Sequence, residues 1–342
     1  MATTGSTEFQ PSTAQSQLGL DQSFIRLKTK PNAQISFNFI PPSADATSKP
    51  QLIVFLNGLG LPKAAWFPVI SGFILSQPHA RPAILAYDRY GQGATIDRDP
   101  ADEGAQNPMH AHDCMSVVYN LRQLIQQIAQ QKMGLEDISK VALIFVANSI
   151  GCAIARLYTQ EYPGSVVGML LLDSVLANSD FVSIFPDPDD DGFDEKALPE
   201  GITGDLLKEA RQKVKMIFHP DNGSKEGLSR KNLRSLLLDS DSPVLKGFCG
   251  RGPYVTVVGH DFETFAEQSE KQLGIPKTLT VNYSNPFWHK YNEGLTRITA
   301  PERSKGPIQG PGCGHFVQAD NPTFVGQELS ELVNRILLED LY

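Results

Sequence analysis

The chain of 342 residues carries 30 basic Lys and Arg side chains against 38 acidic Asp and Glu side chains, so its formal net charge is −8 and its isoelectric point lies near 5.4. This acidic balance, with no polybasic cluster to offset it, argues against nucleic acid or an anionic membrane as a partner. Apolar residues make up 41% of the chain, which suffices for one large domain with an insertion.

Residues 1–22 are rich in Ser, Thr, Gln and Ala and lack the basic start and apolar core of a secretory signal. They predict a flexible tail. No apolar run approaches the roughly 20 residues needed to cross a bilayer, so the cytoplasm is the expected location. The cysteines show no metal-site spacing, which favours reduced thiols: Cys114, Cys152, Cys249 and Cys313.

The first half of the chain alternates between strand and helix patterns. Residues 23–28 and 33–40 predict an antiparallel hairpin. The apolar run 51–56 predicts a buried strand that ends in Asn57-Gly58-Leu59-Gly60, and the run 83–87 predicts another, followed by Asp88-Arg89-Tyr90-Gly91-Gln92-Gly93. Asp113 can cap a helix over residues 114–133, whose apolar stripe would pack against the sheet.

The most informative motif is Ala147-Asn148-Ser149-Ile150-Gly151, which follows an apolar strand pattern at 141–146 and precedes a helical pattern at 152–162. A serine on such a turn is held in a strained conformation, and the residues two before and two after it must be small. Ala147 and Gly151 meet that demand. The motif predicts a nucleophile elbow that exposes the Ser149 hydroxyl at the N-terminus of the following helix.

The alternation breaks after the next predicted strand, at residues 166–172. Residues 174–251 hold an acidic loop and two predicted helices, 204–218 and 229–238, and therefore indicate an insertion. A strand pattern returns at 254–258, followed by Gly259-His260-Asp261. Near the C-terminus lies Gly312-Cys313-Gly314-His315-Phe316, and Asn321-Pro322 opens a last helix.

These motifs, in this order, resemble the α/β-hydrolase fold family, over roughly residues 50–175 and 250–340. The resemblance implies a doubly wound, mostly parallel α/β sheet with an inserted helical cap that roofs the pocket. It divides the chain into a tail at 1–22, a first core part at 23–173, the cap insertion at 174–251 and a second core part at 252–342.

A catalytic triad needs a hydroxyl, an imidazole that removes its proton and a carboxylate that orients the ring. Ser149 and His315 are predicted to supply the first two groups. The family usually places the acid after the strand that precedes the histidine loop, which favours Asp261. Asp173, after the strand that follows the elbow, is the position that some relatives use instead, and Glu263 and Glu293 are further alternatives.

The tetrahedral intermediate needs preorganised donors for its negative charge, normally the amide after the nucleophile and one from the early turn. Ile150 and Leu59 occupy those places. The family's turn usually starts with His, where this chain has Asn57. A plain tight turn at Asn57-Gly58 would have the same backbone, so the motif alone does not decide.

These residues predict a serine hydrolase that cleaves an ester, thioester, lactone or related acyl bond of a small organic substrate through an acyl-enzyme on Ser149. A hydrolase-fold binding protein with weak or absent turnover, and a lyase or peptidase with the same triad, are the alternatives. No cofactor or metal is expected. The acidic loop that begins at Asp187 has Leu198 where a calcium loop needs Glu.

Overall fold

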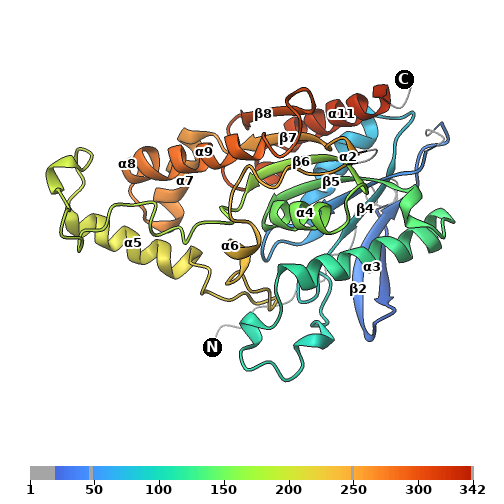
Figure 1. Ribbon diagram of the computed structural model, residues 1–342, viewed down its shortest axis with the longest axis horizontal. Coiled ribbons are helices and arrows are strands. Elements are labelled where there is room, and N and C mark those ends of the chain that lie inside the picture. The colour runs from blue at the N-terminus through green and yellow to red at the C-terminus, as the bar shows by residue number, and fades with distance from the viewer. Residues whose placement is uncertain (1–19, 46–48, 248–249, 340–342) are drawn as a thin grey trace.

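The computed structural model of the protein describes residues 20–45, 49–247 and 250–339, so most of the predicted tail at 1–22 and Cys249 lie outside the described residues. The described chain forms an eight-stranded sheet in the order β1-β2-β4-β3-β5-β6-β7-β8 (Figure 1). The strands are β1 Gln22–Leu27, β2 Lys30–Ile40, β3 Gln51–Leu56, β4 Ala83–Tyr87, β5 Ala142–Ser149, β6 Val166–Ser174, β7 Tyr254–Gly259 and β8 Ser304–Gln309. β1 and β2 pair antiparallel, β2 pairs antiparallel with β4, and every other neighbouring pair is parallel. This confirms the predicted doubly wound α/β fold.

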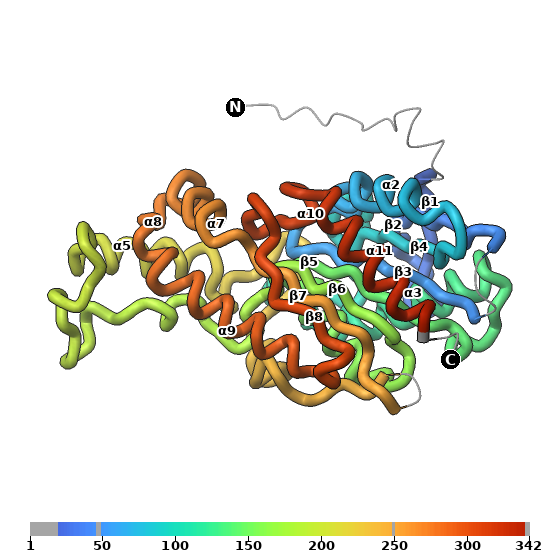
Figure 2. Tube along the Cα trace, turned by 90° about the horizontal axis from the view of Figure 1, so that it is seen from above, coloured from blue at the N-terminus to red at the C-terminus, as the bar shows by residue number. Residues whose placement is uncertain are grey.

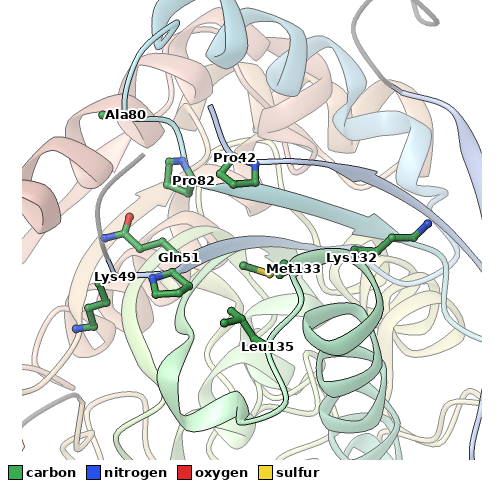
Figure 3. Close-up of a pocket in the computed structure, with 9 residues that line it drawn as sticks. Pro42, Lys49, Gln51, Ala80, Pro82, Lys132, Met133 and Leu135 are labelled. Atoms are coloured by element: carbon green, nitrogen blue, oxygen red, sulfur yellow. The ribbon is translucent and has the colours of Figure 1, made fainter. Parts of the chain in front are cut away.

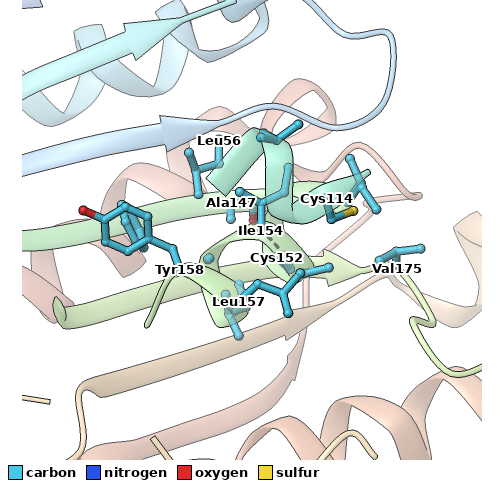
Figure 4. Close-up of a cluster of buried hydrophobic side chains, with 14 of the residues drawn as sticks. Leu56, Cys114, Ala147, Cys152, Ile154, Leu157, Tyr158 and Val175 are labelled. Atoms are coloured by element: carbon cyan, nitrogen blue, oxygen red, sulfur yellow. Dashed lines mark hydrogen bonds between the residues drawn. The ribbon is translucent and has the colours of Figure 1, made fainter. Parts of the chain in front are cut away.

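Helices cover both faces of the sheet. One face carries α2 (Phe67–Ser76) and α11 (Pro322–Glu339), which lie side by side (Figure 2), and the other carries α3 (Cys114–Met133) and α4 (Ile150–Glu161). The central strands are continuous apolar runs because side chains alternate between the two covered faces. In β5, Phe145 packs in the cluster under α3 and α4, whereas Ile144 packs in the cluster under α2 and α11. Figure 4 shows the first cluster where α4 meets the sheet.

Helix α3 begins and ends where its residues predict. The Asp113 side chain accepts the Ser116 amide hydrogen at 2.9 Å, and Gly134, at φ 70°, ends the helix in the left-handed conformation that glycine adopts without strain. Its buried stripe includes Val117 and Leu121. The helix thus fixes one layer over the sheet edge.

The segment between β6 and β7 contains the predicted helix α5 (Gly204–Phe218), but the predicted helix at 229–238 is reduced to the single turn α6 (Leu233–Leu236). Residues before that turn are held in extended pairing instead. The amide of Ser229 donates to the His112 carbonyl at 2.7 Å, and Leu228 forms a β-bridge with His112. This pairing holds the backbone at 228–229 in an extended conformation, so the helix cannot begin there.

A second helical segment lies between β7 and β8. It comprises α7 (Phe262–Gln268), a π-helical turn at Ser269–Leu273, α8 (Lys277–Leu279), a second π-helical turn at Thr280–Ser284 and α9 (Asn285–Leu295). Both views place α7, α8 and α9 at the same end of the molecule as α5 (Figures 1 and 2). The extension beside the sheet is therefore built from two insertions, although the sequence predicts only the first.

The remaining described elements are short. α10 (Val317–Asp320) precedes α11, and 3₁₀ turns occur at Lys63–Trp66, Pro100–Asp102, Pro108–His110, Ile138–Lys140, Glu195–Ala197 and Pro301–Arg303. In the part of the chain that the structure describes, no helix combines the length and apolar character of a membrane span.

A hollow of about 290 Å³ opens at the N-terminal ends of β3 and β4 (Figure 3). Gln51 begins β3, Pro82 precedes β4, and Met133 and Leu135 close the hollow from the end of α3. Ligands of open α/β sheets bind at the opposite, carboxyl ends of the strands. The hollow is thus separate from the predicted site.

Candidate active site

Ser149 sits on a strained turn between β5 and α4, with φ 55° and ψ −122°. Non-glycine residues rarely adopt this conformation, and such strain is concentrated at functional sites. The turn fits because its neighbours are small. A Cβ on Gly151 would lie 2.4 Å from the Leu56 carbonyl oxygen, and one on Gly58 would lie 3.5 Å from the Ser149 Cβ. The elbow geometry predicted from the sequence is therefore present.

His315 is joined to a buried carboxylate and to the elbow. Its Nδ1 donates to Asp173 Oδ2 at 2.6 Å. A proton on Nδ1 leaves Nε2 as the basic nitrogen of the neutral ring. The Asn148 side chain, next to Ser149, donates to the His315 carbonyl at 2.9 Å and to the Leu172 carbonyl at 3.0 Å. One amide thus ties the elbow to the histidine loop.

Asp173 is the penultimate residue of strand β6, with φ 40° and no solvent exposure. Burial raises the pKa of its carboxyl, but the charge and hydrogen bond of His260, with the hydrogen bond and charge of His315, outweigh burial and lower the pKa to about 2. The group is therefore an ionised carboxylate at neutral pH, and it occupies the place of the acid beside His315.

The structure places the preferred acid, Asp261, at the start of α7, with its side chain turned to that helix. This residue caps α7: its side chain accepts the Thr264 amide hydrogen at 2.9 Å, and this bond, ahead of the opposing effect of burial, lowers its pKa. Glu263 pairs with Lys277 on the exposed side of α7, and Glu293 lies 3.6 Å from His289 on α9. The bond to His315 comes instead from Asp173. The sequence feature that points to Asp173 is its place directly after the apolar strand pattern at 166–172.

The proposed oxyanion donors lie at two backbone turns. Ile150 is the first residue of α4, so its amide has no acceptor within the helix. Leu59 lies in the turn after β3, where Asn57 is buried. The Asn57 side chain accepts from Trp66 Nε1 at 2.8 Å and donates to the Tyr87 carbonyl at 3.0 Å. Asn57 thereby anchors the turn from within.

The same turn is clamped by a buried ion pair that the sequence did not reveal. Arg89 donates to the carbonyls of Asn57 and Gly58 at 2.8 and 3.0 Å. Its guanidinium also forms bonds of 2.8 and 3.0 Å with both oxygens of Glu226, and Glu226 Oε1 accepts the Gly60 amide hydrogen at 3.0 Å. Glu226 belongs to the insertion, 137 positions from Arg89. No local pattern could join them.

Aromatic side chains from the two insertions approach the histidines. Trp288 on α9 donates from Nε1 to the Ser174 carbonyl at 2.9 Å, and its ring lies 5.6 Å from that of His315. Trp288 in turn contacts Phe181, which stacks on Phe218 at the end of α5. The insertions therefore contribute the apolar wall beside the candidate base.

Residues 53–328 match the family model described as the alpha/beta hydrolase family, and the chain belongs to that family. The protein resembles a putative lipase from Acinetobacter baumannii at 13% identity and a TM-score of 0.52, over 98% of this chain and 100% of that one. It resembles a mutant epoxide hydrolase from Vigna radiata at 13% identity and a TM-score of 0.51, over 92% and 98% of the two chains. At this identity the likenesses show the fold alone. No protein with a curated description matches.

Proposed function

We propose that the protein is a serine hydrolase that cleaves an ester, thioester, lactone or related acyl bond of a small organic substrate through an acyl-enzyme on Ser149. The observation that carries this proposal is the 2.6 Å bond from His315 to the buried Asp173, in a loop that Asn148 fastens to the strained elbow. A nucleophile, a base and an orienting carboxylate are the parts that acyl transfer requires.

The chemistry follows from the roles of these groups. His315 Nε2 takes the Ser149 proton while Oγ attacks the acyl carbon, and the carbonyl electron pair moves to oxygen. The Leu59 and Ile150 amides stabilise that oxyanion. When the tetrahedral intermediate collapses, the carbonyl re-forms and the leaving group departs with the proton from His315. A water molecule, activated by the same nitrogen, then releases the acid and restores Ser149.

A fluorophosphonate probe, followed by mapping of the modified residue, tests the nucleophile. Ser149→Ala should abolish both labelling and turnover of a short acyl ester, because the acyl-enzyme forms on the hydroxyl that this change removes. Ser139→Ala, at an exposed serine bonded to Asp137, is the matched control and should label normally. Full turnover in the Ser149→Ala variant would disprove the assignment, whereas an unlabelled wild type without turnover would favour a binding protein.

A further inference from the structure

The carboxylate of Asp173 is shared by two histidines. His315 donates to Oδ2, and His260, the first residue after β7, takes the other oxygen. The Nδ1 atom of His260 lies 2.9 Å from Asp173 Oδ1, and its backbone amide donates to the same oxygen at 3.1 Å. A triad needs one imidazole on its carboxylate, so the second ring has no part in the chemistry described above.

The other nitrogen of His260 also faces an acceptor. Its Nε2 lies 3.2 Å from Asn285 Oδ1. The orientation of that amide is set by its own partner, because Asn285 Nδ2 donates to the Phe262 carbonyl at 3.0 Å, and a flipped amide would oppose two oxygens. A neutral imidazole carries one N–H, whereas the cation carries two. Only the cationic form of the His260 ring can donate to both Asp173 Oδ1 and Asn285 Oδ1.

The surroundings of His260 suit a cation paired with one carboxylate. The ring is 1% exposed and stacks on Phe265 at a centroid distance of 3.9 Å, with Trp288 at 5.5 Å and Phe262 at 5.9 Å. Aromatic rings exclude water and attract cations to their faces. Among the described residues, Asp173 is the charged group that contacts this ring, and α7 and α9 present uncharged side chains to it.

We propose that His260 is a positioning residue that is an imidazolium in the resting protein, fixes the carboxylate of Asp173 and makes His315 a free base at lower pH than Asp173 alone would allow. The kinetic part of this proposal rests on the proposed hydrolase function. The protonation of His260 itself rests on the hydrogen-bond geometry and is open to separate measurement.

The effect on His315 follows from the charges of the buried cluster. At rest, the charges of Asp173 and His260 cancel and His315 is neutral. When His315 accepts the proton of Ser149, it shares a carboxylate that His260 already neutralises. A nearby like charge disfavours the protonated ring. His315 therefore stays neutral, and competent as a base, in more acidic solution.

The kinetic test replaces His260 with Asn, which can still donate to Asp173 but carries no charge. The rate of the acylation burst with p-nitrophenyl acetate is measured from pH 5 to 9. In the variant this rate should still rise with pH, but the midpoint of the rise should move upward by roughly one pH unit, the size expected for a lost neighbouring charge. His79→Asn, at an exposed histidine paired with Asp45, is the control and should leave the profile unchanged. A uniform loss of rate with an unmoved midpoint would show a structural role only.

The direct test uses nitrogen NMR of the histidine rings in the Ser149→Ala protein at pH 8. One ring should show both nitrogens protonated, and this signature should disappear in the His260→Asn variant, or in His260→Gln if the former does not fold. A neutral His260 would overturn the proposal. Because this measurement needs no turnover, it determines the charge of His260 even if the nucleophile assignment at Ser149 fails.

Discussion

At the scale of single residues, the choice between Asp173 and Asp261 decides how the base is oriented. Asp173→Asn should lower kcat by about 10⁴-fold, the loss measured when the acid of a well-studied triad is made an amide. Asp261→Asn should leave kcat nearly unchanged, since its side chain caps α7 and Asn caps equally well. The two variants are compared by their initial rates with a short acyl ester, provided that their thermal melts match that of the wild type. Collapse of kcat in the Asp261 variant alone would return the acid to the position that the sequence favoured.

Residue types and spacing predict the elbow and the histidine because both lie in local motifs. The sequence also indicated Asp173, but only as an alternative, because the carboxylate is chosen by which strand end faces the histidine loop. That choice depends on the three-dimensional course of β6 and β7. His260 contacts the Asp173 carboxylate, whereas the adjacent Asp261 caps α7. No spacing rule predicts which of these two neighbouring residues faces the site.

At the scale of elements, Glu226 connects the first insertion to the turn at residues 57–60, which carries the proposed oxyanion donor Leu59. Glu226→Gln should leave the Arg89 cation buried without its counter-charge, and breaking a buried pair costs about 3–5 kcal/mol of folding free energy. Since Arg89 also holds the carbonyls of Asn57 and Gly58, we expect kcat to fall roughly tenfold or more, toward the loss of one oxyanion donor. Urea unfolding and ester turnover measure the two effects.

The control for Glu226 is the exposed ion pair between Asp189 and Lys208 in the same insertion. Asp189→Asn should change stability by less than about 1 kcal/mol, as exposed pairs do, and should leave kcat unaltered. If Glu226→Gln behaved like this control in both assays, the clamp would have no role in shaping the turn.

The aromatic chain from Phe218 through Phe181 and Trp288 to His315 links α5 to the base. Phe218→Leu removes the outermost ring, which stacks on Phe181 at the far end of this chain from His315. We expect KM and the preference among acyl chain lengths to change severalfold, with the rate of probe labelling at Ser149 close to wild type. A folded variant that loses labelling would show that the insertion supports the chemical groups directly.

Elements with a strong local period were predictable, and those defined by pairing were not. Residues 114–133 and 204–218 carry a helical pattern and form helices over those ranges. Strand β8 (Ser304–Gln309) has no apolar run and is a strand because it pairs with the edge of β7.

At the scale of the whole molecule, the sheet separates two apolar clusters with different neighbours. The cluster under α3 and α4 continues into the insertions and includes Trp288, whereas the cluster under α2 and α11 contains Leu329 and reaches the histidine loop through Cys313 and Val317. On α11, away from that loop, stability and catalysis should be separable. The α11 side chains of this cluster support the fold but do not belong to the aromatic wall beside His315.

Two leucines on α11 test this separation. Leu329 is fully buried against the sheet, whereas Leu338 on the same helix is 59% exposed. Leu329→Ala should cost about 2–5 kcal/mol of unfolding free energy because it leaves a cavity, and Leu338→Ala should change it by less than about 0.5 kcal/mol. Probe labelling of Ser149 in the cold, under conditions where thermal melts show both variants still folded, should match wild type. Slower labelling in the Leu329 variant alone would mean that packing on this face reaches the elbow through β5.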